Sequence, residues 1–213
     1  MKKVYIFSGL GADRRVFQFI NFSGLDTIFI NWLTPTENET IEDYALRLTD
    51  QIKTDKPILV GLSFGGIIAT EVAKLIDTEK IVLIASAQTR KEIPFYFRLA
   101  GELRLHRLLP TRLLKQPNFL SNWFFGTENQ TDKKLLADIL WDTDPIFLKW
   151  AIDKIVNWTN ATRHKNIRQI HGTSDRILPI FFTKFDVKVS GGGHFMTVNK
   201  ASELTRLIRN EIA

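Results

Sequence analysis

The chain has 213 residues, of which 44% are hydrophobic and 24% are charged, and it carries a formal net charge of +6. This length favours one domain with an insertion over two domains, and the composition excludes a disordered or fibrous chain. Because the sequence has no Cys and only four His, it excludes a disulfide framework and a Cys nucleophile and leaves few ways to build a metal site.

The N-terminus imitates the start of a signal peptide. Met1-Lys2-Lys3 is followed by only four apolar residues, Val4–Phe7, whereas the apolar region of a signal peptide needs about seven or more. No segment approaches the roughly 18 apolar residues of a membrane-spanning helix. We therefore expect a cytoplasmic protein with a mature N-terminus and no membrane span.

The first 85 residues alternate between short apolar runs and stretches with helical spacing. Pro57 stands at a strand start, where proline is tolerated, and Thr40 and Asp43 form a variant of the capping box. In chain order, the predicted elements are a strand at Val4–Phe7, a helix that starts near Asp13, a strand at Thr27–Ile30, a helix at Thr40–Ile52, a strand at Ile58–Val60, a helix at Phe64–Ile76 with Ile68, Val72 and Leu75 inward, and a strand at Ile81–Ala85.

The alternation breaks between residues 86 and 165, a segment rich in aromatic residues. It holds four of the five Trp, and helical spacing appears at Leu135–Leu140 and Ile146–Val156. Two interpretations are open: a helical insertion that packs its own aromatic side chains, or a cap whose aromatic side chains roof a site. The aromatic residues are Phe95, Tyr96, Phe97, Phe119, Trp123, Phe124, Phe125, Trp141, Phe147, Trp150 and Trp158.

Nearly the whole charge surplus lies in one part of this segment. Between Arg90 and Lys115 there are seven cations and two anions, a net charge of +5 in 26 residues. A solvated basic face explains this stretch, and attraction of an anionic part of a substrate is the alternative. The basic pI also suggests nucleic acid, but the stretch lacks a recognisable reader motif, so we expect no nucleic-acid partner.

The last 48 residues return to the alternating pattern. Strands are predicted at Ile167–Ile170 and Phe185–Val189, and Ala201–Ile212 has the spacing of an amphipathic helix. Strands that alternate with helices form parallel sheets covered on both faces. The pattern therefore predicts an α/β fold.

A candidate nucleophile lies between the strand Ile58–Val60 and the helix that follows it. Residues 61–66 read Gly-Leu-Ser-Phe-Gly-Gly, which is G-x-S-x-G in a strand–turn–helix setting. So tight a turn strains the backbone of Ser63 and lifts its hydroxyl clear of the sheet, and Gly61 and Gly65 stand where a Cβ would collide. The helix N-terminus favours a developing oxyanion.

A serine nucleophile needs a base, and the chain offers four His. We expect His106 to be a surface side chain in the basic stretch and His164 to lie on a loop. His171 ends a strand, where packing or a local hydrogen bond explains it. His194 follows three glycines after the last strand, which free a loop to bring its imidazole to the carboxyl edge of the sheet, so it is the candidate base.

The base needs a carboxylate that orients it. Asp175 comes directly after the strand Ile167–Ile170, in a loop that opens on the same edge of the sheet. Asp144 is a weaker rival, because it precedes Pro145 and more simply starts a helix. Asp13 is interpreted as a helix-start residue.

The order Ser63, Asp175, His194, with the motifs Gly-Leu-Ser-Phe-Gly-Gly, His-Gly-Thr-Ser-Asp-Arg and Gly-Gly-His-Phe, resembles the α/β-hydrolase superfamily over nearly the full length. The resemblance implies an α/β-hydrolase fold with about six mostly parallel strands and helices on both faces. It implies a core at residues 1–85 and 166–213 and a helical cap at residues 86–165.

The resemblance also implies an oxyanion hole made of two backbone N–H groups. One belongs to Phe64, and the other comes from the loop after the first strand, here Leu10 beside Gly9. The family often carries His-Gly in that loop, where this chain has Ser8-Gly9. The family's usual first two strands are missing, and the trimmed edges are a surface that a homodimer would cover.

Together these residues predict a serine hydrolase of the carboxylesterase kind. Its substrate would be a small carboxylic ester or thioester with an apolar acyl or aromatic group, cleaved through an acyl-enzyme without metal or organic cofactor. Two alternatives stay open: a C–C bond hydrolase or lyase on the same triad, and a ligand-binding module whose triad is inactive.

Overall fold

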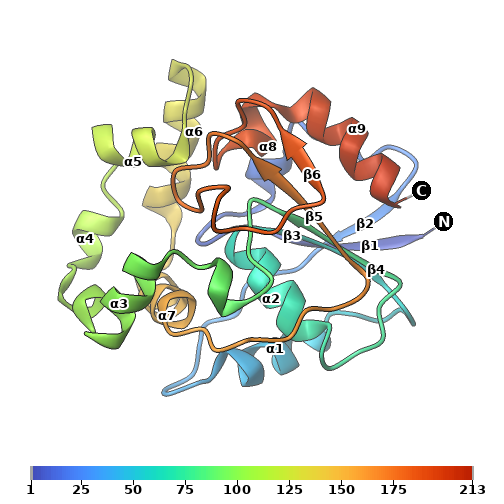
Figure 1. Cartoon of the computed structure of the whole chain (residues 1–213), viewed down its shortest axis with the longest axis horizontal. Helices are drawn as coiled ribbons and strands as arrows, with labels where there is room; N and C mark the ends of the chain where they lie inside the picture. The colour runs from blue at the N-terminus through green and yellow to red at the C-terminus, as the bar shows by residue number, and fades with distance from the viewer. Residues whose placement is uncertain (1, 213) are drawn as a thin grey trace.

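The computed structural model describes residues 2–212, and a six-stranded sheet runs through its centre (Figure 1). All neighbouring strands are parallel, in the order β2-β1-β3-β4-β5-β6. The strands are β1 (Lys3–Phe7), β2 (Asp26–Phe29), β3 (Ile58–Leu62), β4 (Lys80–Ile84), β5 (Ile167–Gly172) and β6 (Val187–Val189).

Helices fill most of the remaining chain. They are α1 (Ile41–Thr49), α2 (Phe64–Val72), α3 (Phe95–Glu102), α4 (Thr111–Leu114), α5 (Phe119–Phe125), α6 (Gln130–Asp142), α7 (Pro145–Val156), α8 (Met196–Asn199) and α9 (Ala201–Ile212), with short 3-10 helices η1 (Arg14–Phe17), η2 (Arg90–Glu92) and η3 (Leu105–Leu108). Over the described residues, no helix combines the length and the apolar character that crossing a bilayer requires.

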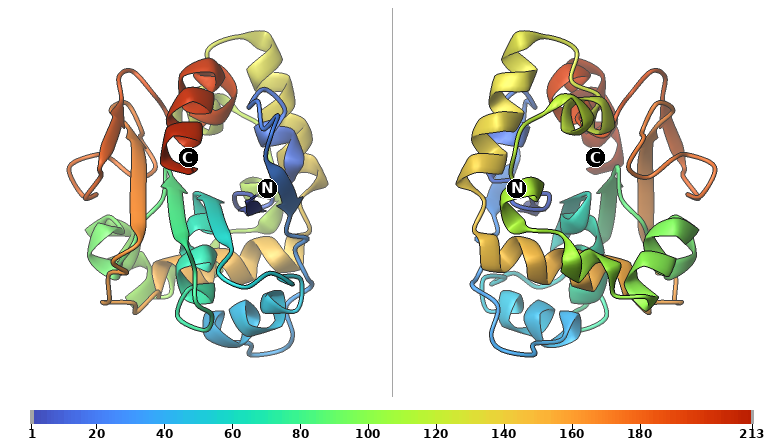
Figure 2. Two further views of the ribbon diagram at one scale, coloured as in Figure 1. Left: turned by 90° about the vertical axis from the view of Figure 1, so that its right-hand side faces the viewer. Right: turned by 90° about the vertical axis from the view of Figure 1, so that its left-hand side faces the viewer.

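Helices cover both faces of the sheet. Val4 and Ile6 of β1 face a core that also contains residues of α6, α8 and α9, whereas Tyr5 and Phe7 face a core with residues of α1, α2 and α7. Figure 1 shows α1, α2 and α7 below the sheet and α8 and α9 above it, and Figure 2 shows these layers from two sides. Because parallel strands are buried on both faces, β1 is a continuous apolar run rather than an alternating one.

Several strands and helices begin or end one to three residues from their predicted positions, for example α1, which ends at Thr49 and not at Ile52. The last strand begins at Val187 and not at Phe185, because the Asp186 carboxylate accepts the Gln169 backbone N–H that strand pairing would otherwise use (2.8 Å). Helix α2 ends at Val72 and not at Ile76, because the N–H groups of Lys74 and Leu75 donate to carbonyls three residues earlier instead of four. Leu75 is exposed and does not face inward as predicted. The helix predicted near Asp13 is only the single 3-10 turn η1.

The helix caps follow the predictions. Thr40 Oγ1 accepts from the Asp43 N–H at 3.0 Å, and Asp144 caps α7 by accepting from the Phe147 N–H at 2.7 Å. Asp13 accepts from the Arg15 N–H at 2.8 Å at the start of η1. Each short polar side chain satisfies an N–H that the first helical turn leaves without a partner.

The segment between β4 and β5 divides into two parts. Helices α6 and α7 belong to the two cores: Leu136 and Ile139 pack on one face of the sheet, and Phe147 and Ala151 pack on the other. Helices α3 to α5 contribute almost nothing to either core, since Gly101 is the single buried residue among them. Figure 1 shows α3, α4 and α5 at the end of the molecule away from both termini.

Candidate active site

The predicted site residues come from loops at one edge of the sheet. Leu10 follows β1, Ser63 follows β3, Asp175 follows β5 and His194 follows β6. The carboxyl ends of parallel strands share one edge, where open α/β sheets place their sites. The fold therefore brings together residues that lie up to 184 positions apart in the chain.

Ser63 sits in a strained turn between β3 and α2. Its φ is +52° and its ψ is −122°, a conformation that residues with a Cβ rarely adopt. The turn is held from β4, since the Ser63 N–H donates to the Ile84 carbonyl at 2.9 Å and the Ser86 hydroxyl donates to the Ser63 carbonyl at 2.7 Å. A Cβ on Gly65 would overlap the backbone carbonyls of Phe7 and Ser8 at the end of β1, so α2 can approach β1 only because this residue is glycine.

Ser63, His194 and Asp175 form a continuous chain of hydrogen bonds. The Ser63 Oγ lies 2.8 Å from His194 Nε2, and His194 Nδ1 lies 2.8 Å from Asp175 Oδ2. The side chains of His194 and Asp175 are buried. The loop before His194 runs close against the end of β5, because a Cβ on Gly172 would overlap the Gly192 carbonyl and a Cβ on Gly192 would lie only 3.2 Å from the Gly172 Cα.

Hydrogen bonds to both oxygens orient the Asp175 carboxylate. Oδ1 accepts from the backbone N–H groups of Ile177 and Leu178, each at 2.9 Å, and Oδ2 faces His194. Burial by itself raises the pKa of the Asp175 carboxyl, but the imidazoles of His194 and His171 and the Leu178 N–H outweigh it and bring that pKa below its usual value. The carboxylate is therefore charged at neutral pH.

His171 is buried directly beside this carboxylate. Its Nε2 lies 2.7 Å from the Leu178 carbonyl and 3.6 Å from Asp175 Oδ2, so Nε2 carries the hydrogen that it donates to Leu178. Burial lowers the pKa of the His171 imidazole, although Asp175 and the hydrogen bond to Leu178 act in the opposite direction. A neutral His171 thus ties down the segment that orients Asp175.

The lowered pKa of His171 predicts a loss of stability in mild acid. Below about pH 6.5, the unfolded chain binds a proton at His171 that the folded chain excludes, so the free energy of unfolding falls as the pH is lowered toward the folded pKa. In His171→Gln, whose amide can still donate to Leu178, we expect a shallower pH dependence between about pH 6.5 and pH 5 in urea unfolding. An unchanged slope would contradict this assignment.

A matched variant separates titration from the hydrogen bond. His171→Leu removes both, so its free energy of unfolding should be about 1–3 kcal/mol lower than that of His171→Gln at every pH, because the buried Leu178 carbonyl loses its donor.

Two backbone N–H groups lie in the loops that flank Ser63. Within the described chain, neither the Leu10 N–H nor the Phe64 N–H donates to a protein atom. Gly9 brings the first loop close, since a Cβ on it would lie 3.6 Å from the Ser63 Cβ. Ser8 fixes that loop, because its hydroxyl donates to the Ala12 carbonyl at 2.6 Å and accepts from the Trp32 indole N–H at 3.1 Å.

An apolar cavity of about 120 Å³ opens beside Ser63 and His194. Helix α6 supplies one wall with a side-chain pattern of i, i+3, i+4, and the end of α5 supplies Phe125, whose ring packs edge-on against His194 at 5.7 Å. Phe125 is one of the aromatic residues that the sequence offers for a cap, whereas the α6 residues were not predicted to line a site, although their helical spacing is a signal for one apolar face. The lining side chains from these helices are Phe125, Leu136, Ile139 and Leu140.

The other two His lie elsewhere. His164 is on the predicted loop. His106 does not have the predicted surface position: its side chain is only 6% exposed, because η3 folds against α7 and His106 Nε2 meets Asp153 Oδ1 at 2.8 Å. In the described part of the chain, no three His, Asp or Glu side chains gather as metal ligands.

The comparisons with known proteins give the family. A model of the alpha/beta hydrolase family matches residues 4–205, so the chain belongs to this family. The predicted superfamily and fold class are thereby confirmed. No curated protein matches the sequence.

Solved structures share the fold at low identity. A bromoperoxidase from Bacillus anthracis has a TM-score of 0.73 and 16% identity, over 99% of this chain and 91% of that chain. Est816, described as an N-acyl homoserine lactone degrading enzyme, has a TM-score of 0.71 and 15% identity over 99% and 93%. An esterase from Exiguobacterium antarcticum has a TM-score of 0.70 and 14% identity over 100% and 92%. At such identities, the likeness concerns the fold alone.

Proposed function

We propose that the protein is a serine hydrolase that cleaves small carboxylic esters or thioesters with a short apolar acyl group. The observation that carries the proposal is the hydrogen-bonded chain from Ser63 through His194 to Asp175, at 2.8 Å in both steps. A nucleophile, a base and an orienting carboxylate in this order are the parts that acyl transfer needs.

In the first half-reaction, Ser63 Oγ attacks the acyl carbon while His194 Nε2 takes its proton. Asp175 holds the Nδ1–H tautomer, which leaves the Nε2 lone pair directed at the hydroxyl. The unpartnered N–H groups of Leu10 and Phe64 stabilise the oxyanion, helped by the N-terminus of α2.

Collapse of the first intermediate completes this half-reaction, when His194 returns its proton to the departing alcohol or thiol and the acyl group stays on Ser63. In the second half-reaction, His194 deprotonates a water molecule that attacks the acyl-enzyme, and the oxyanion forms again at the same N–H groups. Collapse of this second intermediate releases the acid, and His194 returns the proton to Ser63 Oγ. No step requires a metal or an organic cofactor.

The cavity supports a short acyl group. Its volume of about 120 Å³ is somewhat below the roughly 150 Å³ of an apolar cavity that holds benzene, and its lining is almost entirely apolar. Helices of the segment at residues 86–165 supply one wall, so we propose that this segment acts as a cap that shapes the acyl site. The esterases and the lactone-degrading enzyme among the structural neighbours support ester chemistry.

Labelling with a fluorophosphonate probe tests the proposal. We expect the probe to label the wild type on Ser63, as located by peptide mass, because the base at 2.8 Å activates this hydroxyl. Ser63→Ala should lose the label, whereas Ser190→Ala, a change at an exposed serine in the loop after β6, should keep it. In a panel of esters, acetyl and butyryl groups should be cleaved at least about tenfold faster than octanoyl groups.

A folded wild type that takes no label and cleaves no ester would refute the proposal and favour a ligand-binding module. Faster cleavage of octanoyl esters would refute only the short acyl site.

A further inference from the structure

Helices α3 to α5 expose an unusual amount of apolar surface. Of 19 large apolar side chains that are exposed in the described chain, 12 lie between residues 95 and 124, including Leu108 at 77% and Phe119 at 80%. We call this region the α3–α5 surface. Its exposed apolar residues are Phe95, Tyr96, Leu99, Leu103, Leu105, Leu108, Leu109, Leu113, Phe119, Leu120, Trp123 and Phe124.

The protein itself does not cover this surface. Helices α4 and α5 bury no residue, and η3 turns only the His106 side chain inward. Single exposed apolar side chains are ordinary, whereas many exposed apolar side chains gathered on successive helices mark an interaction site. Its position at the end of the molecule away from the termini leaves it accessible (Figure 1).

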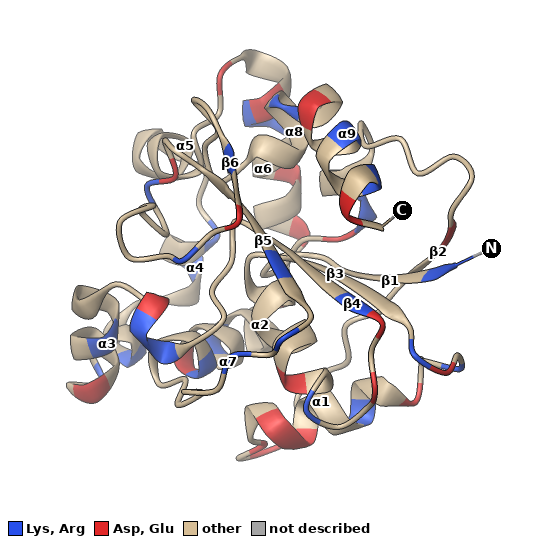
Figure 3. Cartoon of the chain, turned by 45° about the vertical axis from the view of Figure 1, so that its right-hand side comes forward, with Lys and Arg blue, Asp and Glu red and all other residues tan. Residues whose placement is uncertain are grey.

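Cations are interleaved with the apolar side chains of the α3–α5 surface. Between residues 95 and 124 there are five Lys and Arg and one acidic residue, Glu102, a net charge of 5 − 1 = +4. Glu102 is already paired with Arg90 at 2.6 Å. Figure 3 shows Lys and Arg along α3 and near α7. The cations are Arg98, Arg104, Arg107, Arg112 and Lys115.

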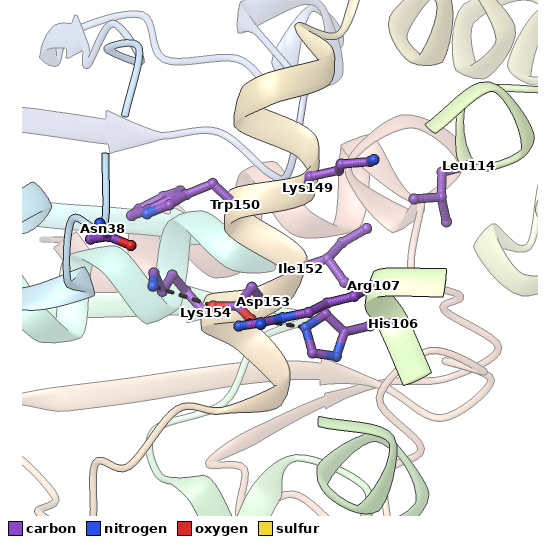
Figure 4. Close-up of a pocket in the computed structure, with 9 residues that line it drawn as sticks. All are labelled: Asn38, His106, Arg107, Leu114, Lys149, Trp150, Ile152, Asp153 and Lys154. Carbon is purple, nitrogen blue, oxygen red and sulfur yellow. Dashed lines mark hydrogen bonds and ion pairs between the residues drawn. The ribbon is translucent and has the colours of Figure 1, made fainter. Parts of the chain in front are cut away.

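A basic hollow of about 460 Å³ adjoins this surface, between α7 and the η3–α4 region (Figure 4). Arg107, Lys149 and Lys154 line it together with one carboxylate, Asp153. That carboxylate is already engaged, because it lies 2.8 Å from His106 Nε2 and 3.3 Å from Lys154 Nζ. The charge left in the hollow is positive, and the hollow has room for an anionic group.

We propose that the α3–α5 surface docks the protein on a membrane that contains anionic phospholipids. Leu and aromatic side chains interleaved with Lys and Arg are the features that interfacial helices use, the apolar groups entering the acyl boundary and the cations facing the phosphates. A second copy of the chain would set +4 against +4, which opposes a dimer through this face. The basic hollow accepts a lipid phosphate at the edge of the contact.

The docking places the catalytic cavity near the lipid. Helix α5 exposes Phe119, Leu120 and Trp123 and ends at Phe125, which lines the cavity. The proposal does not depend on the hydrolase reaction, since binding is measured without turnover.

Sedimentation with lipid vesicles tests the docking. We expect the wild type to sediment with vesicles of equal parts phosphatidylcholine and phosphatidylglycerol but not with phosphatidylcholine alone, and high salt should weaken binding. Leu108→Gln with Phe119→Gln, and separately Arg104→Glu with Arg112→Glu, should each lower the partition coefficient at least about tenfold.

Matched controls lie outside the α3–α5 surface. Phe181→Gln changes a side chain that is 78% exposed, and Arg206→Glu with Arg209→Glu reverses two exposed cations of α9. Both controls should bind within about twofold of the wild type, and circular dichroism should show every variant folded. Absence of wild-type binding to the anionic vesicles would overturn the proposal, as would equal losses in the controls. A wild-type dimer that the surface variants dissociate, without vesicle binding, would assign the surface to a second copy instead.

Discussion

Asp175→Asn is expected to lower kcat/KM by about 10⁴-fold, with little change in fold. The orientation of the new amide is dictated by the backbone, because Asp175 Oδ1 accepts from the Ile177 and Leu178 N–H groups. The Asn oxygen must keep those two bonds, so its NH₂ group must face His194. His194 Nδ1 then becomes the acceptor, and its hydrogen moves to Nε2, where it faces Ser63 and removes the base.

Steady-state hydrolysis of a short-chain ester measures this effect. Asp144→Asn is the matched control: Asp144 caps α7 through the Phe147 N–H, and Asn caps a helix about as well as Asp, so both activity and stability should stay near wild type. If the two variants lost activity equally, Asp175 would not orient the base. If Asp175→Asn kept more than about a tenth of the activity, the proposed triad would be wrong.

Gly65→Ala is expected to destabilise the fold by about 3 kcal/mol or more. A Cβ at this position would overlap the carbonyl oxygens of Phe7 and Ser8, and these belong to backbone that cannot rotate away as a side chain can. Relief would require α2 to move away from β1, which would displace both Ser63 and the loop that carries Leu10. The prediction therefore joins a loss of stability with a loss of activity.

Urea unfolding compares this variant with Gly9→Ala. Gly9 lies in the loop beside the site, but a Cβ there would meet its neighbours at 3.6 Å or more, which is ordinary van der Waals contact. We expect Gly9→Ala to unfold within about 0.5 kcal/mol of the wild type. If Gly65→Ala were equally tolerated, the close approach of α2 to β1 would not depend on glycine.

The sequence by itself determined the order of the strands along the chain, the family and the residues that meet at the site. Short apolar runs predict strands because parallel strands are buried on both faces. The apolar run of β1 therefore predicts a strand without any knowledge of which strands pair with it. The G-x-S-x-G spacing around Ser63 is local at Gly61, where a Cβ would overlap Gly65 and Gly66 of the same turn, whereas the requirement for glycine at Gly65 comes from the backbone at the end of β1. Asp175 and His194 were predicted to lie beside Ser63 because the carboxyl ends of parallel strands share one edge of the sheet.

Only the tertiary structure decided which side chains are covered. The His106 side chain is buried because η3 folds back on Asp153 of α7. These two residues are 47 positions apart, so no local sequence pattern predicts their contact. The lining of the apolar cavity beside Ser63 by Phe125 and α6, and the late start of β6 at Val187, depend in the same way on distant partners. The aromatic composition of residues 86–165 also did not predict that Phe147 packs in the core whereas Phe119 is exposed. Burial is a property of pairs of elements, so a pattern in one segment predicts its type but not its neighbours.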